Sequence, residues 1–198
     1  MLRVGLTGGI GSGKTTISNQ FSSAYGTPII DADEISRQLL LPNGKAYEET
    51  INLFGPECVL ESNDINRKFI REKIFTDDSL RLLLENIIHP KVEAEISAQV
   101  KSLDAQYCLI VIPLLIESNM QSMVDRILVI DINKQSQLNR VASRDRCEIK
   151  HVEAIVNAQI DSAERLKYAD DIITNNGQPE DLITQIHQLH EKYLDLTN

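Results

Sequence analysis

The chain has 198 residues, 42% hydrophobic and 25% charged, a composition that excludes disordered, collagen-like and coiled-coil proteins. Because 29 acidic residues outnumber 20 lysines and arginines, the net charge of −9 argues against nonspecific nucleic-acid binding. Without an apolar run of roughly 20 residues, a secretory signal or a paired cysteine pattern, it is predicted to be cytoplasmic, with no membrane partner, as a monomer or weak oligomer.

The first thirty residues predict a strand, a turn, a helix and a second strand. Residues 2–7 alternate around apolar positions and enter the glycine-rich segment 8–13. Apolar residues then recur with helical spacing over 17–24, and 28–31 forms a short apolar run. Strand, helix and strand in this order form the repeating unit of a parallel sheet.

Residues 34–104 change to helical periodicity and predict a helical insertion into the α/β chain. The pair His89-Pro90 is expected to interrupt it, because proline disfavours a helical conformation in the preceding residue. A new amphipathic run then continues towards Leu103.

Three later strands complete a predicted five-stranded parallel sheet. Segments 107–112 and 126–132 are continuous Val/Ile/Leu-rich runs, typical of strands buried on both faces, and helical patterns follow both. A short strand at 171–174 leads through Asn175-Asn176-Gly177 into a terminal helix.

The segment Gly8–Thr15 matches the phosphate-loop pattern G-x-x-x-x-G-K-[ST] in the strand-to-helix context that this motif requires. Its glycines let backbone amides point at phosphate oxygens, and the following helix adds its positive end. Lys14 is expected to reach the β- and γ-phosphates, and the Thr15 hydroxyl to coordinate Mg²⁺. Asn133-Lys134 lacks the rest of the guanine motif N-K-x-D, which disfavours GTP. The predicted nucleotide-binding residues of the loop are Gly9, Ile10, Gly11, Ser12, Gly13, Lys14, Thr15 and Thr16.

Acidic residues follow the second strand at its carboxyl edge, where ligands bind in open parallel sheets. Asp33 is therefore expected to face one crevice with Lys14 and to accept or orient the proton of an attacking hydroxyl. The alternative is that Asp31 or Asp33 only caps the helix that begins near Glu34. Asp131, which also ends an apolar strand, is interpreted as structural and not as a magnesium ligand.

Nearly the whole chain resembles the dephospho-CoA kinase family, whose members phosphorylate the ribose 3'-hydroxyl of dephospho-CoA with ATP. The resemblance implies a three-layer P-loop kinase: a nucleotide-binding core from 1–33 and 105–198, a lid near 140–150, and an acceptor-binding domain from 34–104. The matching motifs are Leu6–Lys14, Asp31-Ala32-Asp33, Phe54-Gly55, Arg71, Phe75, His89-Pro90, Pro113-Leu114-Leu115 with Glu117, Gln137 with Arg140 and Arg144, Gln159, Ala169-Asp170 and Asn175-Asn176-Gly177.

The resemblance also implies site residues beyond the loop. Arg140 and Arg144 share a helical face and are expected to neutralise charge on the triphosphate when the lid closes, unless they form only a solvated surface. Asn175 and Gly177 are expected beside adenine. Substrate binding is assigned to Thr7, Asp33, Arg71, His89, Leu114, Leu115 and Glu117. The alternatives are surface solubility for Arg71, a structural role at a helix break for His89, and packing or a cap for Leu114, Leu115 and Glu117.

The function predicted from the sequence is ATP- and Mg²⁺-dependent, direct in-line phosphorylation of dephospho-CoA, with Asp33, Lys14 and Arg140 as catalytic residues. A second possibility within enzymes is a P-loop kinase for a nucleotide or a sugar-like alcohol. A third is a nucleotide-binding regulator that closes on ATP and signals to a protein partner, in which Asp33 would be dispensable.

Overall fold

The computed structural model describes the backbone of residues 1–198 and every side chain except that of Pro179. The chain divides into two compact units: a sheet unit, Met1–Asp31 with Ser102–Asn198, and a helical unit, Ala32–Lys101. The sequence places its boundaries at residues 33 and 105, close to this division. The functional roles expected of the two parts stay predictions.

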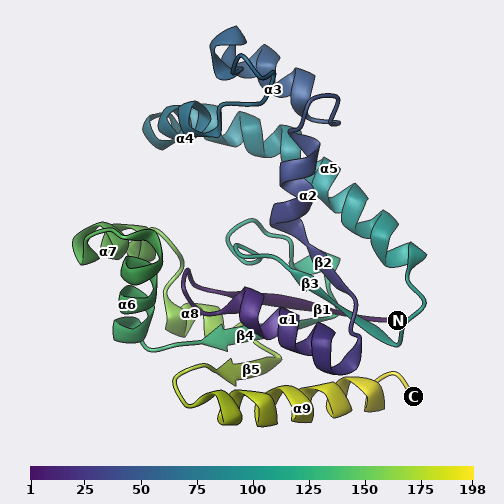
Figure 1. Ribbon diagram of the computed structural model, residues 1–198. Helices are drawn as coiled ribbons and strands as arrows, with labels where there is room; N and C mark the ends of the chain where they lie inside the picture. Colours follow the sequence, from purple (N-terminus) through teal and green to yellow (C-terminus); the bar gives the residue numbers. More distant parts are fainter. The chain divides into compact units, whose positions relative to one another are not determined.

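The sheet unit is built on five parallel strands in the order β2-β3-β1-β4-β5 (Figure 1). This confirms the expected α/β fold and the number of strands. Because β1 lies at the centre, the loop that follows it opens at the middle of the sheet's carboxyl edge. The strands are β1 Leu2–Gly8, β2 Ile29–Asp31, β3 Tyr107–Val111, β4 Arg126–Asp131 and β5 Asp171–Thr174.

Helices α1 Lys14–Tyr25 and α9 Pro179–Asp195 pack side by side against one face of the sheet (Figure 1). Alternate strand residues point into this core, which therefore forms a continuous apolar layer. Its fully buried members are Val4, Leu6, Ile17, Phe21, Leu109, Leu128, Ile173 and Tyr193.

Segment 112–124 lies against the opposite face of β1. A Cβ atom on Gly5 would lie 2.9 Å from Val124 Cγ1 and 3.1 Å from Leu115 Cδ2. Helix α8 Ser162–Leu166 contacts β4, and α6 Lys134–Asp145 packs on α7 Ile149–Asn157 around Leu138, Val141 and Val152. Layers on both sides of a parallel sheet explain why its strands are almost continuously apolar.

The helical unit packs around a core of its own. The residues that form this core are Tyr47, Cys58, Ile65, Ile70 and Leu84. Its elements are α2 Ala32–Leu39, α3 Tyr47–Phe54, the 3-10 turn η1 Pro56–Cys58, α4 Arg67–Thr76 and α5 Asp78–Ser102. None of the helices described is long and apolar enough to span a membrane.

The expected interruption at His89-Pro90 is wrong, because α5 runs without a break from Asp78 to Ser102 with Pro90 inside it. An interior proline costs about 3 kcal/mol in an exposed helix. Here, apolar residues are buried on both sides of it, Leu84 before and Val92 after.

The prediction of a helix after the third strand is also wrong. Between β3 and β4 the described chain forms turns and a 3-10 turn, η2 Gln121–Met123. The single helical turn at 114–119 ends because Asn119 adopts a left-handed conformation with φ 55°. The helical pattern expected after the fourth strand is confirmed by α6.

Candidate active site

The loop between β1 and α1 forms a tight cradle at the carboxyl edge of the sheet. Its turn is closed by the Ser12 amide, which donates to the Gly9 carbonyl oxygen at 3.1 Å. Gly13 caps α1 with φ 98°, a conformation open to glycine, and a Cβ atom there would lie 2.5 Å from Asn175 Nδ2. The following backbone amides belong to the first turn of α1, which has no acidic side chain to compete for an anion.

The Lys14 ammonium lies against this loop and donates to the carbonyl oxygens of Gly8 at 2.7 Å and Gly9 at 3.2 Å. These bonds hold the charge at the mouth of the cradle. Ser12 is fully buried, and its hydroxyl oxygen is one of three buried side-chain N or O atoms among the described residues that have no hydrogen-bond partner. A Cβ atom on Gly8 would lie 2.8 Å from this hydroxyl oxygen, so the Ser12 side chain packs against the start of the loop.

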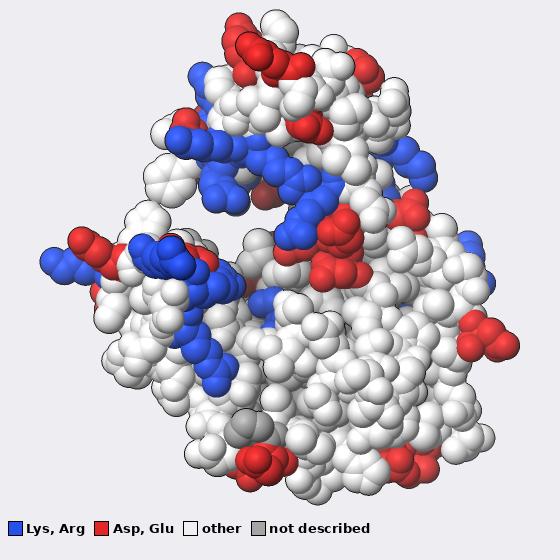
Figure 2. Space-filling model, viewed as in Figure 1, with Lys and Arg blue, Asp and Glu red and all other residues white. Residues whose placement is uncertain are grey.

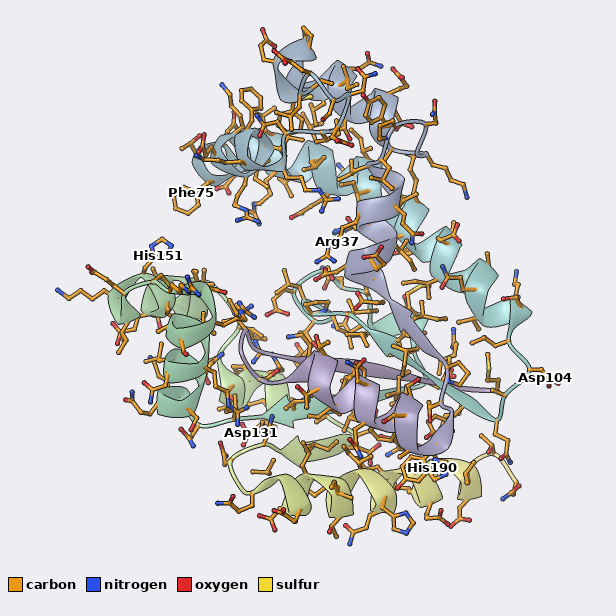
Figure 3. The ribbon with its side chains drawn as sticks, in the orientation of Figure 1. Arg37, Phe75, Asp104, Asp131, His151 and His190 are labelled. Carbon is orange, nitrogen blue, oxygen red and sulfur yellow. The ribbon has the colours of Figure 1, made fainter. Side chains whose placement is uncertain are left out.

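Thr15 lies in the first turn of α1 with an exposed side chain, where its hydroxyl fits the expected role towards a phosphate-bound Mg²⁺ ion. Within the described part of the chain, no three His, Cys, Asp or Glu side chains lie close enough together to form a metal site. Asp131 at the end of β4 (Figure 3) accepts a hydrogen bond from Ser162 Oγ at 3.1 Å, in keeping with its structural interpretation.

Three side-chain amides reach the backbone of the loop from segments far away in the sequence. Gln137 Nε2 donates to the Ile10 carbonyl oxygen at 2.8 Å, and Gln159 Oε1 accepts from the Ile10 amide at 2.9 Å. Asn175 Nδ2 donates to the Ser12 carbonyl oxygen at 2.7 Å. Both glutamines belong to the motifs that carry the family resemblance, but their spacing in the sequence indicates no role. Only the fold brings them to the loop.

Of the two arginines expected in the lid, only Arg140 is tied to the loop's surroundings. Its Nη2 donates to the Asn175 carbonyl oxygen at 3.1 Å, and Nη1 would lie 3.9 Å from a Cβ atom on Gly13. Arg144, one turn later in α6, pairs instead with the neighbouring Asp145 at 2.7 Å. Asn175 is thus joined to both Ser12 and Arg140, and its expected position beside adenine stays a prediction, as does that of Gly177.

A cavity of about 250 Å³ lies in the sheet unit between the loop at Gly9, the end of β4, and helices α6 and α8. Arg165 lines it, is 5% exposed, and pairs with Glu117 at 3.4 Å. Arg165 Nε and Glu117 Oε2 are also among the described buried atoms without a hydrogen-bond partner. Arg165 is therefore a charged wall residue that no sequence pattern indicated, and Glu117 is connected to the cavity through its pair with Arg165.

Other residues expected to bind substrate occupy different environments. Thr7 is fully buried and donates its hydroxyl proton to the Pro113 carbonyl oxygen at 3.2 Å. Leu115 is also fully buried, where it packs beneath β1, whereas Leu114 is 44% exposed. Packing is thus sufficient to explain Leu115, and Leu114 is the leucine with surface to offer a ligand.

The helical unit carries the remaining predicted residues. Asp33 is exposed in the first turn of α2, His89 is half-buried on α5, and Arg71 is exposed on α4. Lysine and arginine side chains gather over α4 (Figure 2), which contains Arg67, Lys68, Arg71 and Lys73. The expected approach of Asp33 to Lys14 stays a prediction.

The family model described as dephospho-CoA kinase matches residues 2–181. The chain belongs to the dephospho-CoA kinase family. It is accordingly a kinase and a transferase, and the resemblance expected from its motifs is confirmed.

Relatives support this membership over the full length. A dephospho-CoA kinase of Aggregatibacter actinomycetemcomitans is 42% identical, with 98% of this chain and 91% of that protein covered. A crystal structure from Thermus thermophilus has a TM-score of 0.85 at 27% identity and covers 96% of this chain and 97% of that one. A dephospho-CoA kinase from Campylobacter jejuni has a TM-score of 0.71 at 28% identity and covers 99% and 98%.

Proposed function

We propose that this chain transfers the γ-phosphoryl group of ATP to the ribose 3'-hydroxyl of dephospho-CoA, giving coenzyme A and ADP. The observation that carries the proposal is the cradle at Gly8–Thr15 in a chain of this family. Its amides, the first turn of α1 and the Lys14 ammonium place positive potential where the β- and γ-phosphates would lie.

The transfer is direct and in line, without a phosphoenzyme. The loop amides and Lys14 hold the triphosphate, and Arg140 balances negative charge on the migrating group. The Asp33 carboxylate orients the acceptor hydroxyl or accepts its proton at a carboxylate oxygen. This reaction requires Asp33 to come within hydrogen-bond reach of that hydroxyl while the loop holds ATP.

Mg²⁺ is part of the proposal, with the Thr15 hydroxyl as its protein ligand beside the phosphate oxygens. When bound, the ion neutralises charge on the β- and γ-phosphates. Arg71, His89, Leu114 and Glu117 are proposed acceptor contacts, and Arg144, Asn175 and Gly177 are proposed nucleotide contacts. A cytoplasmic location, a monomeric or weakly oligomeric state and the lack of nucleic-acid and membrane partners stay predictions.

A coupled ADP assay tests the function with dephospho-CoA, adenosine, AMP and shikimate as acceptors, with and without Mg²⁺. We expect Mg²⁺-dependent ADP production that depends on dephospho-CoA and is far slower with the other three. Preference for another acceptor would indicate a different P-loop kinase. ATP binding without turnover of any acceptor would favour a nucleotide-binding regulator.

A further inference from the structure

Both backbone groups of one loop residue are held by glutamine side chains. The Ile10 amide donates to Gln159 Oε1 at 2.9 Å, and its carbonyl oxygen accepts from Gln137 Nε2 at 2.8 Å. Gln137 comes from the second turn of α6 and is 8% exposed, and Gln159 comes from the segment between α7 and α8. We call this arrangement the glutamine clamp.

The loop is shaped to admit the clamp. A Cβ atom on Gly9 would lie 2.5 Å from Gln137 Nε2 and 3.5 Å from Gln159 Oε1, so a side chain at this position would displace the amide of Gln137. The Ile10 side chain packs on the apolar cluster of Leu138, Val141 and Val152 between α6 and α7. Polar and apolar contacts therefore attach the same residue to the same helix pair.

The backbone fixes which end of each amide makes each bond. A carbonyl oxygen can only accept, so Gln137 must present its nitrogen to Ile10, and an N–H group can only donate, so Gln159 must present its oxygen. The two glutamines are consequently not equivalent to chemical substitution. A carboxylate can replace Gln159 as acceptor but cannot replace Gln137 as donor.

We propose that Gln137 and Gln159 are positioning residues that fix the two peptide groups on either side of Ile10, so that the phosphate cradle and the start of α6 form one preorganised body. This rests on the proposed use of the loop for ATP. A glycine-rich loop loses much conformational freedom on ordering. The clamp orders the loop before ATP binds, and its neutral amides leave the positive potential of the site intact.

The clamp also bears on catalysis, because the proposed catalytic residue Arg140 lies on the same helix as Gln137. It follows Gln137 by one helical turn on α6 and donates to Asn175, whose amide in turn donates to the Ser12 carbonyl oxygen. The loop is therefore tied to α6 at Ile10 and, through Asn175, at Ser12. The clamp places Arg140 beside the loop ahead of any lid closure, so the mobile part of a lid would begin beyond it.

The test compares Gln137→Glu with Gln159→Glu. Both variants add the same negative charge beside the loop, but only Gln137→Glu loses its hydrogen bond to Ile10. The difference in ATP affinity between the two variants therefore measures the effect of that bond. We expect ATP affinity, measured by calorimetry, to be about threefold to tenfold weaker in Gln137→Glu than in Gln159→Glu, the size of one hydrogen bond. The matched control is Gln135→Glu, an exposed glutamine of α6 that bonds only Asn139, which should bind ATP like the native protein.

A second measurement reports the clamp directly. Hydrogen exchange of the Ile10 amide, followed by NMR without nucleotide, should be at least about tenfold faster in Gln159→Ala than in Gln135→Ala. The KM for dephospho-CoA should stay unchanged in all these variants, because the clamp acts through the ATP loop. Thermal unfolding checks that each variant is folded. If Gln137→Glu does not fold, Gln137→Asn replaces it, because an asparagine side chain is too short to reach Ile10.

Equal ATP affinities for the two glutamate variants, or unchanged Ile10 exchange in Gln159→Ala, would overturn the clamp. These readouts need no acceptor. If the native protein binds ATP but does not phosphorylate dephospho-CoA, the proposed function fails while the clamp remains testable.

Discussion

The two edges of the sheet use polar residues in opposite ways. At the amino edge, charged side chains are matched within the fold: Arg126 and Lys192 both donate to the buried Asp171, at 2.9 and 2.5 Å. At the carboxyl edge, the loop backbone is held by neutral amides from Gln137, Gln159 and Asn175. Charges that are compensated within the fold stabilise it, whereas neutral partners hold a loop without cancelling the positive charge that an anion needs.

The amino edge also contains a buried aromatic cluster. Tyr107, at the start of β3, bonds Thr27 at 2.9 Å and His190 of α9 (Figure 3) at 2.7 Å, and burial raises the pKa of this tyrosine to about 12. His190 stacks on Tyr25 with ring centroids 3.9 Å apart, and burial lowers the pKa of the histidine. Tyr107 and His190 therefore stay neutral at pH 7, and the cluster joins α1, β3 and α9.

The largest effect should come from Asp33, which follows the carboxyl end of β2. Asp33→Asn removes the group proposed to handle the acceptor hydroxyl, and kcat should fall about 10²- to 10⁴-fold. ATP affinity and the unfolding free energy should stay close to native. The control is Glu34→Gln, one residue further along α2. Retention of native kcat in Asp33→Asn would remove Asp33 from the mechanism.

Lys14→Met should produce a somewhat smaller loss that affects two quantities together. The variant loses the ammonium that meets the phosphates, so we expect kcat to fall about 10²- to 10³-fold and ATP affinity to weaken about tenfold or more. Lys134→Met, on an exposed part of α6, is the control. If ATP binds Lys14→Met with native affinity in calorimetry, the cradle is not where the triphosphate lies.

At the amino edge, Asp171→Asn should change stability and leave catalysis intact. The Asp171 carboxylate is 2% exposed and also accepts from Tyr193 at 3.2 Å, so its loss leaves Arg126 without its partner. We expect the unfolding free energy to fall by about 2–3 kcal/mol in urea denaturation. The kcat of the folded fraction should stay native, and a large change in kcat would contradict the separation of the two edges.

Asp171→Asn also tests how the unfolding free energy depends on pH. Burial by itself raises the pKa of Asp171, but the hydrogen bonds from Arg126 and Lys192 outweigh it and hold this pKa below its ordinary value. A depressed carboxyl pKa contributes stability that is complete above the unfolded-state pKa of about 3.9 and is lost as the pH falls through the folded-state pKa. As the pH falls below about 4 and through the folded-state pKa, the unfolding free energies of the native protein and of Asp171→Asn should therefore converge.

The sequence predicts the parts of this molecule that local patterns determine. The five strands follow from apolar runs, and the loop follows from Gly8, Gly13 and Lys14 at fixed spacing. The helix through Pro90 was not predictable in this way, since burial of Leu84 and Val92 outweighs the local preference of proline.

The contacts of the candidate site that the sequence did not indicate join residues far apart in the chain. Gln137 and Gln159 act on Ile10, and nothing in the spacing of these residues indicates that they meet. Glu117 belongs to a motif of the family, but nothing in the sequence indicates that Arg165 of α8 pairs with it. Leu115 was assigned by position to a crevice, whereas its packing beneath β1 buries it fully.

The smallest effect should come from a second ion pair at the amino edge. Asp125 accepts from the backbone amide of Arg3 at 2.8 Å and from its guanidinium at 2.5 and 3.0 Å. As in the pair of Arg126 and Asp171, two guanidinium nitrogens meet the two carboxylate oxygens. The side chains, however, are 34% and 37% exposed, and water and salt screen the pair. Asp125→Asn should therefore lower the unfolding free energy by only about 0.5–1 kcal/mol, and the difference should shrink in 1 M salt. Both pairs lie at one sheet edge and both join a guanidinium to a carboxylate, so a loss as large as that of Asp171→Asn would mean that burial does not set their contribution.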